Sequence, residues 1–327
     1  MAVRGALDGA TARPYDAPAL RGDTEVRHGP GGTKPGPACS GAPAEPTEAR
    51  GRGKARIVNG AEVRLGRLFD AKSGRAFIAA FDHGVTGGPK PRSENVREVV
   101  GEIIKGGPEG ILITPGVLKQ TADLFAHRGA PDPIVRVDWI HNYEVFPGLP
   151  KKLQSTAQGE QYEVVCSPEE AVSLGAEAIT CFLIVGHEDG AAYAANVRAL
   201  ASLAEDARRV GVPLICEAVL WGARVIDDKQ DAELLAFASR VAAELGADVV
   251  KTAYTGDPES MRKVIDGCPV PVLVLGGARS ATPEPVIAAT KGALAAGAKG
   301  VVYGRNVWQA DDRLAICKLL RGVIHGE

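Results

Sequence analysis

Eight short apolar runs, separated by longer stretches of helical periodicity, are the feature that most constrains the fold of this chain. Each run is continuous rather than alternating, which is typical of strands buried on both faces of a parallel sheet. The stretches between them, such as 193–210 and 231–245, place their apolar residues at helical spacing. The eight runs are residues 77–81, 110–114, 134–138, 178–185, 213–218, 248–251, 270–275 and 300–303.

A phrase that occurs three times indicates that one structural unit is reused. Leu174-Gly175-Ala176, Leu245-Gly246-Ala247 and Ala296-Gly297-Ala298 each end a helical stretch just before an apolar run. Glycine at this point is typical of a helix C-terminus that turns into a strand. Eight strands joined by such units predict an α/β fold, the (β/α)8 TIM barrel. A doubly wound open sheet is the alternative, but Asp82-His83-Gly84 follows the first strand in place of its Gly-rich turn.

The first 56 residues differ in composition from the rest of the chain. They contain ten Gly and seven Pro, and after Met1 only four residues of the Val, Leu, Ile, Phe and Met types. Such a segment cannot bury enough apolar surface to offset the entropy of ordering it. We therefore expect residues 1–56 to form a disordered N-terminal extension and residues 57–327 to form a single barrel, the usual length for this fold.

Charge and hydropathy exclude several classes of partner. Residues 57–327 carry 29 Lys or Arg against 34 Asp or Glu, so no nucleic-acid surface is expected on the barrel. No run of about 18 apolar residues is present, so no membrane span is expected. The N-terminal segment lacks the apolar region of a secretory signal, and the six cysteines form no C-x-x-C pair. We therefore expect a cytoplasmic protein with reduced, mostly buried thiols.

Lys251 is the residue that says most about chemistry. Active sites of such barrels lie at the C-terminal ends of the strands, and Lys251 follows the apolar residues of the sixth run. Burial there disfavours the charged ammonium, which makes a neutral amine available to attack a carbonyl. A lysine that only leaves the barrel into solvent is the alternative. Asp82, at the end of the first run, can accept or donate protons beside it.

Glycines after the seventh and eighth runs suggest a phosphate site. Gly276-Gly277 and Gly304-Arg305 occupy the positions where barrels often bind phosphate through backbone N–H groups and a cation. Plain tight turns are the alternative reading of the glycines. The third and fifth runs end near Asp138 and Glu217. The six histidines are scattered without the spacing of a zinc site, so no metal is expected.

Four motifs combine these residues in one order along the chain. They are Phe81-Asp82-His83-Gly84 with Gly88-Pro89, Val250-Lys251-Thr252 with Tyr254-Thr255-Gly256-Asp257, Gly267-Cys268-Pro269 with Gly276-Gly277, and Gly304-Arg305-Asn306 with Trp308-Gln309. Together they resemble the archaeal-type class I fructose-bisphosphate aldolases, which are Schiff-base enzymes. That family also includes aminodideoxyheptulosonate synthase and the autoinducer-2 thiolase. The resemblance covers about residues 76–325.

The resemblance implies a role for each matching residue. Lys251 matches the lysine that forms the imine, and Asp82 matches the acid/base carboxylate. The backbone of Gly84, Val85 and Thr86 matches substrate contacts, and the two halves of the phosphate site match Gly276-Gly277 and Gly304-Arg305. The implied partner is a phosphorylated sugar or another keto phosphate, no cofactor is required, and a homo-oligomer is expected.

The chain departs from the family where many members have Tyr-Pro-Arg-Gly after the fifth strand. Here the residues are Val219-Leu220-Trp221-Gly222, and the valine at the tyrosine position cannot move a proton. Glu217, on the same side of the strand, is our candidate for that acid/base work. The alternative is that Glu217 only pairs with Lys251 or another cation.

The sequence indicates the roles of other residues near the site less specifically. For His83 a supporting hydrogen bond is favoured over general base catalysis, although the histidine matters more in a thiolase. Tyr254 and Tyr303 are further proton-donor candidates, with packing favoured for Tyr303. The long insertion at residues 139–161 is expected to shape the pocket.

The reaction expected from these residues is aldol cleavage or formation of a ketose phosphate such as fructose 1,6-bisphosphate through an imine on Lys251. The missing tyrosine leaves open a thiolase-type acyltransferase acting on a phosphorylated diketone. A biosynthetic aldolase of the aminodideoxyheptulosonate synthase type is a further alternative. The non-enzymatic alternative is a sugar-phosphate-binding protein, against which the retention of Lys251 and Asp82 argues.

Overall fold

The computed structural model describes residues 59–141, 160–224 and 228–327, and they contain a closed barrel of eight parallel strands. Around the barrel the strands follow the order β1-β10-β9-β8-β7-β6-β3-β2. The barrel strands are β1 (Ala76–Phe81), β2 (Gly110–Ile113), β3 (Asp132–Arg136), β6 (Ala178–Val185), β7 (Leu214–Leu220), β8 (Val249–Ala253), β9 (Val272–Leu275) and β10 (Gly300–Tyr303). All eight predicted strands are therefore present, and the predicted (β/α)8 barrel is confirmed.

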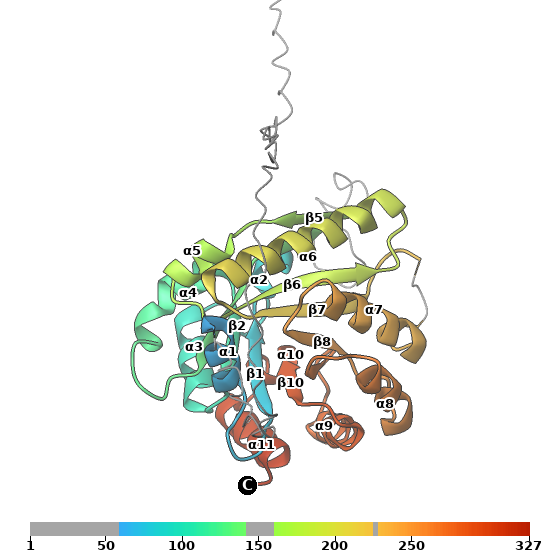
Figure 1. Cartoon of the computed structure of the whole chain (residues 1–327). Helices are drawn as coiled ribbons and strands as arrows, with labels where there is room; N and C mark the ends of the chain where they lie inside the picture. Colours follow the sequence, from blue (N-terminus) through green and yellow to red (C-terminus); the bar gives the residue numbers. More distant parts are fainter. Residues whose placement is uncertain (1–58, 142–159, 225–227) are drawn as a thin grey trace, which may run out of the picture. The chain divides into compact units, whose positions relative to one another are not determined.

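Helices surround the strands (Figure 1), and apolar residues of most of these helices pack against the barrel. They are α1 (Gly60–Leu68), α2 (Gly84–Gly87), α3 (Val96–Lys105), α4 (Pro115–Thr121), α5 (Pro168–Ser173), α6 (Gly190–Val210), α7 (Ala232–Glu244), α8 (Pro258–Asp266), α9 (Glu284–Ala296), α10 (Arg305–Trp308) and α11 (Arg313–His325). None of the helices within the described ranges is long and apolar enough to cross a membrane. The five cysteines of these ranges are free and buried.

The repeated Gly-Ala phrase has the role expected of it. Gly175, Gly246 and Gly297 have φ of 99°, 106° and 109°, values that disfavour residues with a Cβ. Each glycine lies between a helix and the barrel strand that follows it. The phrase is therefore a helix end that reverses the chain into the next strand.

The third strand ends earlier than the sequence predicts. β3 stops at Arg136, and Asp138 begins β4 (Asp138–His141), which pairs antiparallel with β5 (Gln161–Val164) outside the barrel. Residues 134–140 contain only two isolated charges, Arg136 and Asp138, and no Gly or Pro, so hydropathy alone does not mark the boundary between the two strands. The middle of the predicted insertion, residues 142–159, and the predicted N-terminal extension both lie outside the described residues.

Gly300 offers a direct test of the closure of the barrel between β10 and β1. Its φ is 139°, and an added Cβ would lie 1.9 Å from the carbonyl oxygen of Ala76. We expect Gly300→Ala to lower the free energy of unfolding by about 3 kcal/mol or more, because backbone must move to admit the methyl group. Denaturant unfolding measures this. Gly66→Ala is the matched control, since nothing lies within 4 Å of that position, and an equal loss there would contradict the assignment.

Candidate active site

The side chains that point into the barrel change from apolar to charged within two residues along each of four strands. Ala80, Ile134, Ile215 and Val249 belong to an apolar layer inside the strands, closed from below by Leu68 of α1. Side chains two residues apart in a strand share a face. The next inward residues of the same four strands are Asp82, Arg136, Glu217 and Lys251, and all four are buried. The sequence thus places four charged groups in one layer at the C-terminal end of the barrel.

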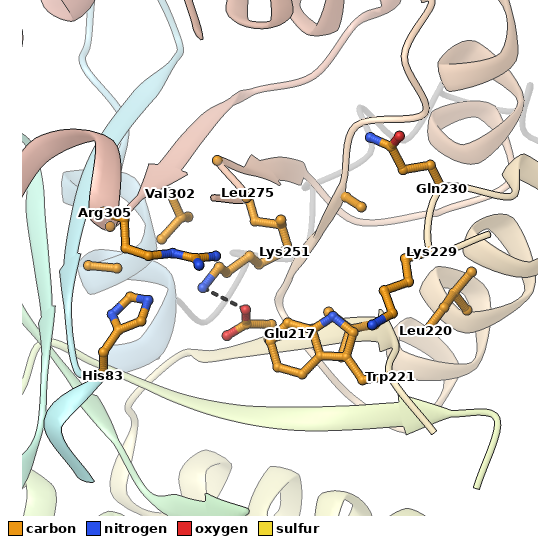
Figure 2. A pocket seen from close by; sticks show the side chains of 16 residues that line it. His83, Glu217, Leu220, Trp221, Lys229, Gln230, Lys251, Leu275, Val302 and Arg305 are labelled. Carbon is orange, nitrogen blue, oxygen red and sulfur yellow. Dashed lines mark ion pairs between the residues drawn. The ribbon is translucent and has the colours of Figure 1, made fainter. Parts of the chain in front are cut away.

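Lys251 and Glu217 form the central ion pair of this layer. They are register partners on the neighbouring strands β8 and β7, and Lys251 Nζ lies 2.8 Å from Glu217 Oε1. Their residues are 5% and 3% exposed, so water screens the pair little. Figure 2 shows the two side chains pointing toward each other in the cavity. Glu217 is therefore placed to exchange a proton with the amine.

Arg136 holds three carboxylates at once. Its Nε donates to Asp82 Oδ2 at 2.9 Å, its Nη1 to Asp138 Oδ1 at 3.2 Å, and its Nη2 to Glu217 Oε2. The guanidinium carbon also lies 3.8 Å from the centre of the Phe182 ring. The side chain is 2% exposed, and the surrounding carboxylates, despite the cost of burial, hold the pKa of Arg136 well above its ordinary value. Arg136 is thus a permanent charge within the site.

Asp82 is the fourth charged residue of this layer, and His83 lies beside it. Burial favours the neutral acid, but the positive charges of Arg136 and Lys251 hold the pKa of Asp82 below its ordinary value. Burial lowers the pKa of His83, so its imidazole is neutral at pH 7. His83 Nδ1 lies 3.5 Å from Asp82 Oδ1, and its ring packs on Trp308 with centroids 5.6 Å apart. Asp82 is therefore a carboxylate at neutral pH, and the His83 ring lies beside its Oδ1.

A cavity of about 270 Å³ opens above Lys251. Its polar lining includes His83, Glu217, Lys251, Arg305 and the predicted phosphate-site glycines, Gly276, Gly277 and Gly304. In Figure 2, His83 and Arg305 lie on one side of Lys251, and Trp221 and Lys229 lie on the other. Burial lowers the pKa of Arg305, whose Nε has no hydrogen-bond partner. An anion bound beside it would supply the missing partner.

A second, smaller space of about 40 Å³ adjoins this cavity and reaches the carboxylates. Lys251, Glu217 and His83 line both spaces, whereas Asp82, Val85 and Thr86 line only the smaller one. Gly84 lines neither; it lines a third cavity beside α4, which His83 and Val85 also line. The structure thus brings ten of the eleven candidate residues around Lys251, and Gly84 is the one that it does not.

The two tyrosines considered as proton donors lie elsewhere. The Tyr254 hydroxyl packs against Gly292 of α9, and the Tyr303 hydroxyl is hydrogen-bonded to Thr290 at 2.8 Å. Neither lines the cavity, and both belong to the layer between strands and helices. The tyrosine prediction is therefore wrong for Tyr254, while packing is the role of Tyr303. Val219 does line the cavity, so an apolar side chain occupies the position of the family's tyrosine.

Arg136 is the site residue that sequence reasoning missed. The signal was a single cation within the apolar run Ile134-Val135-Arg136-Val137. A charge inside a strand buried on both faces needs a partner of opposite sign. No group of three His, Cys, Asp or Glu in the described ranges is arranged to hold a metal ion.

Comparison with known proteins assigns the chain to one family. The family model described as DeoC/LacD family aldolase matches residues 76–310, which is more than half of the 327-residue chain. The chain belongs to this family. It is therefore an aldolase, an aldehyde-lyase, and the family resemblance of its four motifs is confirmed.

Three known proteins illustrate the relationship of this aldolase to others. It is 36% identical over 270 residues to an uncharacterised aldolase of Saccharolobus solfataricus, covering 81% of this chain and 94% of that one. It is 33% identical over 263 residues to the 2-amino-4,5-dihydroxy-6-oxo-7-(phosphonooxy)heptanoate synthase of Streptomyces griseus, covering 80% and 89%. A solved archaeal fructose-1,6-bisphosphate aldolase, whose catalytic Lys is covalently bound to the carbinolamine intermediate of the substrate, aligns with a TM-score of 0.68. The identity is 29%, and the alignment covers 81% and 99% of the two chains.

Proposed function

We propose that this aldolase is a class I enzyme that forms an imine between Lys251 and the keto group of a ketose phosphate such as fructose 1,6-bisphosphate. The observation that carries the proposal is a buried amine, 2.8 Å from a carboxylate, in the same cavity as the anion-binding candidate Arg305. A catalytic lysine bound to a carbinolamine in the archaeal relative supports it. A carboxylate at hydrogen-bond distance allows the amine to be deprotonated without water entering the site.

Imine formation is assigned to the Lys251–Glu217 pair. The ammonium gives a proton to Glu217, and the neutral amine attacks the carbonyl carbon to form a carbinolamine. Glu217, now a carboxylic acid, returns the proton to the departing hydroxyl, which leaves as water. The products are the iminium on Lys251 and the Glu217 carboxylate, so protons and charge balance. Because the transfer stays inside the ion pair, the net charge of the buried layer does not change.

Carbon–carbon bond cleavage is assigned to Asp82. The iminium accepts the electron pair when the C3–C4 bond breaks, and the proton of the C4 hydroxyl must leave at that moment. Asp82 lines the space beneath Lys251, and its lowered pKa keeps it a carboxylate able to take that proton. It later returns a proton to the enamine carbon. The reverse reaction, addition of the enamine to an aldehyde, uses the same groups.

Two other reactions have an observation in their favour. Val219 at the tyrosine position favours a thiolase-type transfer of an acyl group from a phosphorylated diketone to coenzyme A. The synthase relative from Streptomyces griseus favours a biosynthetic aldol reaction. A turnover assay with ketose phosphates and a phosphorylated diketone, with and without coenzyme A, separates aldol cleavage from acyl transfer. Aldehyde release without coenzyme A is expected, and product formation that requires coenzyme A would contradict the aldolase proposal.

Arg305 is proposed to bind the substrate phosphate together with the glycine backbone. Hydrogen bonds to a charged group contribute about 1.5–3 kcal/mol. We therefore expect Arg305→Met to raise KM for the phosphorylated substrate by about 10–100-fold, with kcat much less affected. Steady-state kinetics measures both. Arg279→Met is the matched control because Arg279 lies outside the cavity and pairs with Asp311. An unchanged KM in Arg305→Met would contradict the assignment.

A further inference from the structure

Arg136 and its carboxylates are arranged in a way that the proposed chemistry does not yet use. Each of Asp82 and Glu217 gives one oxygen to the guanidinium: Oδ2 of Asp82 to Nε, and Oε2 of Glu217 to Nη2. The other oxygen of each faces the site. Asp82 Oδ1 lies 3.5 Å from His83 Nδ1, and Glu217 Oε1 lies 2.8 Å from Lys251 Nζ. One side chain thus fixes two carboxylates and leaves one oxygen of each directed at the site.

The third carboxylate, Asp138, serves as the anchor of this arrangement. Asp138 is 0% exposed, accepts from Arg136 Nη1 through Oδ1, and accepts the backbone N–H of Phe182 through Oδ2. The Phe182 ring in turn lies under the guanidinium. Asp138 and Phe182 therefore fix both the position and the plane of the Arg136 guanidinium. Neither of them lines the cavity above Lys251.

We propose that Arg136 is a positioning residue that fixes the orientations of Asp82 and Glu217, so that the oxygen of Asp82 it leaves unbound is directed to the substrate and that of Glu217 to Lys251. This inference rests on the proposed function. It assigns different proton transfers to the two carboxylates. Glu217 exchanges a proton with the Lys251 amine, and Asp82 exchanges a proton with the substrate. Only a planar cation with donors on three nitrogens can bind three carboxylates in fixed directions; the point charge of a lysine cannot.

The sign of the pH effect follows from the charges around Asp82. Burial alone raises the pKa of Asp82, and Arg136 makes the largest contribution that lowers it. The other titratable groups facing Asp82 are Lys251, whose charge also lowers its pKa, and His83, which does so only when it is protonated. With Arg136 in place, the carboxylate persists to low pH and activity falls only as the pH drops through that lowered pKa. Without the guanidinium, the acid limb of kcat moves to higher pH.

The test compares Arg136→Gln and Arg136→Lys with the wild type over a range of pH. We expect kcat to fall at least about 100-fold in both variants, as when an acid/base group is lost, while KM changes little because Arg305 is intact. The acid limb of kcat should rise by on the order of one pH unit in Arg136→Gln. Arg321→Lys is the matched control, since Arg321 pairs with Glu109 at the opposite end of the barrel.

A purely structural role predicts a different result. Loss of folded enzyme would lower kcat equally at all pH values, so a fall without movement of the acid limb in Arg136→Gln would overturn the proposal, as would kcat within about threefold of wild type in both variants. If Arg136→Gln does not fold, the kcat of Arg136→Lys tests the proposal. This variant keeps the positive charge but not the three fixed donors, so near-wild-type kcat would overturn the proposal.

A separate measurement distinguishes this inference from the proposed function. If the wild type forms no imine with any keto phosphate, the proposed function fails. Carbon-13 NMR titration of Asp82 then still tests Arg136, because it needs no substrate. We expect the midpoint of Asp82 to rise in Arg136→Gln, which removes the positive charge, and an unchanged midpoint there would overturn the inference.

Discussion

Replacing Lys251 by methionine is expected to abolish imine formation and to lower turnover by at least about a thousandfold, because the amine that forms the covalent bond is removed. Methionine keeps much of the apolar stem that packs in the barrel while removing the amine. Borohydride reduction in the presence of a ketose phosphate, followed by intact-mass measurement, detects the imine, and an aldehyde-release assay measures turnover. We expect no adduct and near-background release.

The matched control for Lys251 is a second lysine of the same cavity. Lys229 lines the opposite side of the space and comes from the segment between β7 and α7. Lys229→Met should still be trapped by borohydride, because it leaves Lys251 and Glu217 intact. If trapping persisted in Lys251→Met and disappeared in Lys229→Met, the nucleophile would be Lys229 and the assignment would be wrong.

The second large effect is expected at Asp82. Asp82→Asn keeps the size of the side chain but cannot take a proton, so we expect kcat for cleavage to fall by about 100–10,000-fold, the usual range for a lost acid/base group. Imine trapping should remain, because Glu217 still serves Lys251. Rapid-quench trapping and steady-state turnover separate the two steps.

The control for Asp82→Asn must remove one negative charge in the same way without changing the site. Asp311→Asn is suitable, because Asp311 is 77% exposed and pairs with Arg92 and Arg279 on the surface. Normal turnover in Asp82→Asn would remove Asp82 from the mechanism. Loss of trapping together with turnover would instead show that Asp82 is needed before the imine forms.

The barrel itself was predictable from the sequence for a clear physical reason. Strands buried on both faces must be continuous apolar runs, and helix ends such as Gly175 and Gly246 must tolerate positive φ. Both signals are local, so they can be recognised without the structure. The small sheet of β4 and β5 was missed because a single residue, Val137, separates β3 from β4 and no Gly or Pro marks the boundary.

The site was predictable only in part. Lys251, Asp82 and Arg305 follow or end strands, where the fold alone gives them a role. The directions of side chains are a different matter: Tyr254 follows β8 closely, yet its hydroxyl packs against α9. The ion pairs of Arg136 with Asp82 and Glu217 join residues 54 and 81 positions apart in the sequence, and no local pattern encodes such contacts.

The most direct test of the central claim is to identify the lysine that reacts. The wild-type enzyme is reduced with borohydride during turnover of a ketose phosphate, digested, and the modified peptide sequenced by mass spectrometry. A single reduced sugar-phosphate adduct on Lys251, absent without substrate, is the predicted result. An adduct on any other lysine, or turnover of the ketose phosphate without any adduct, would contradict the account.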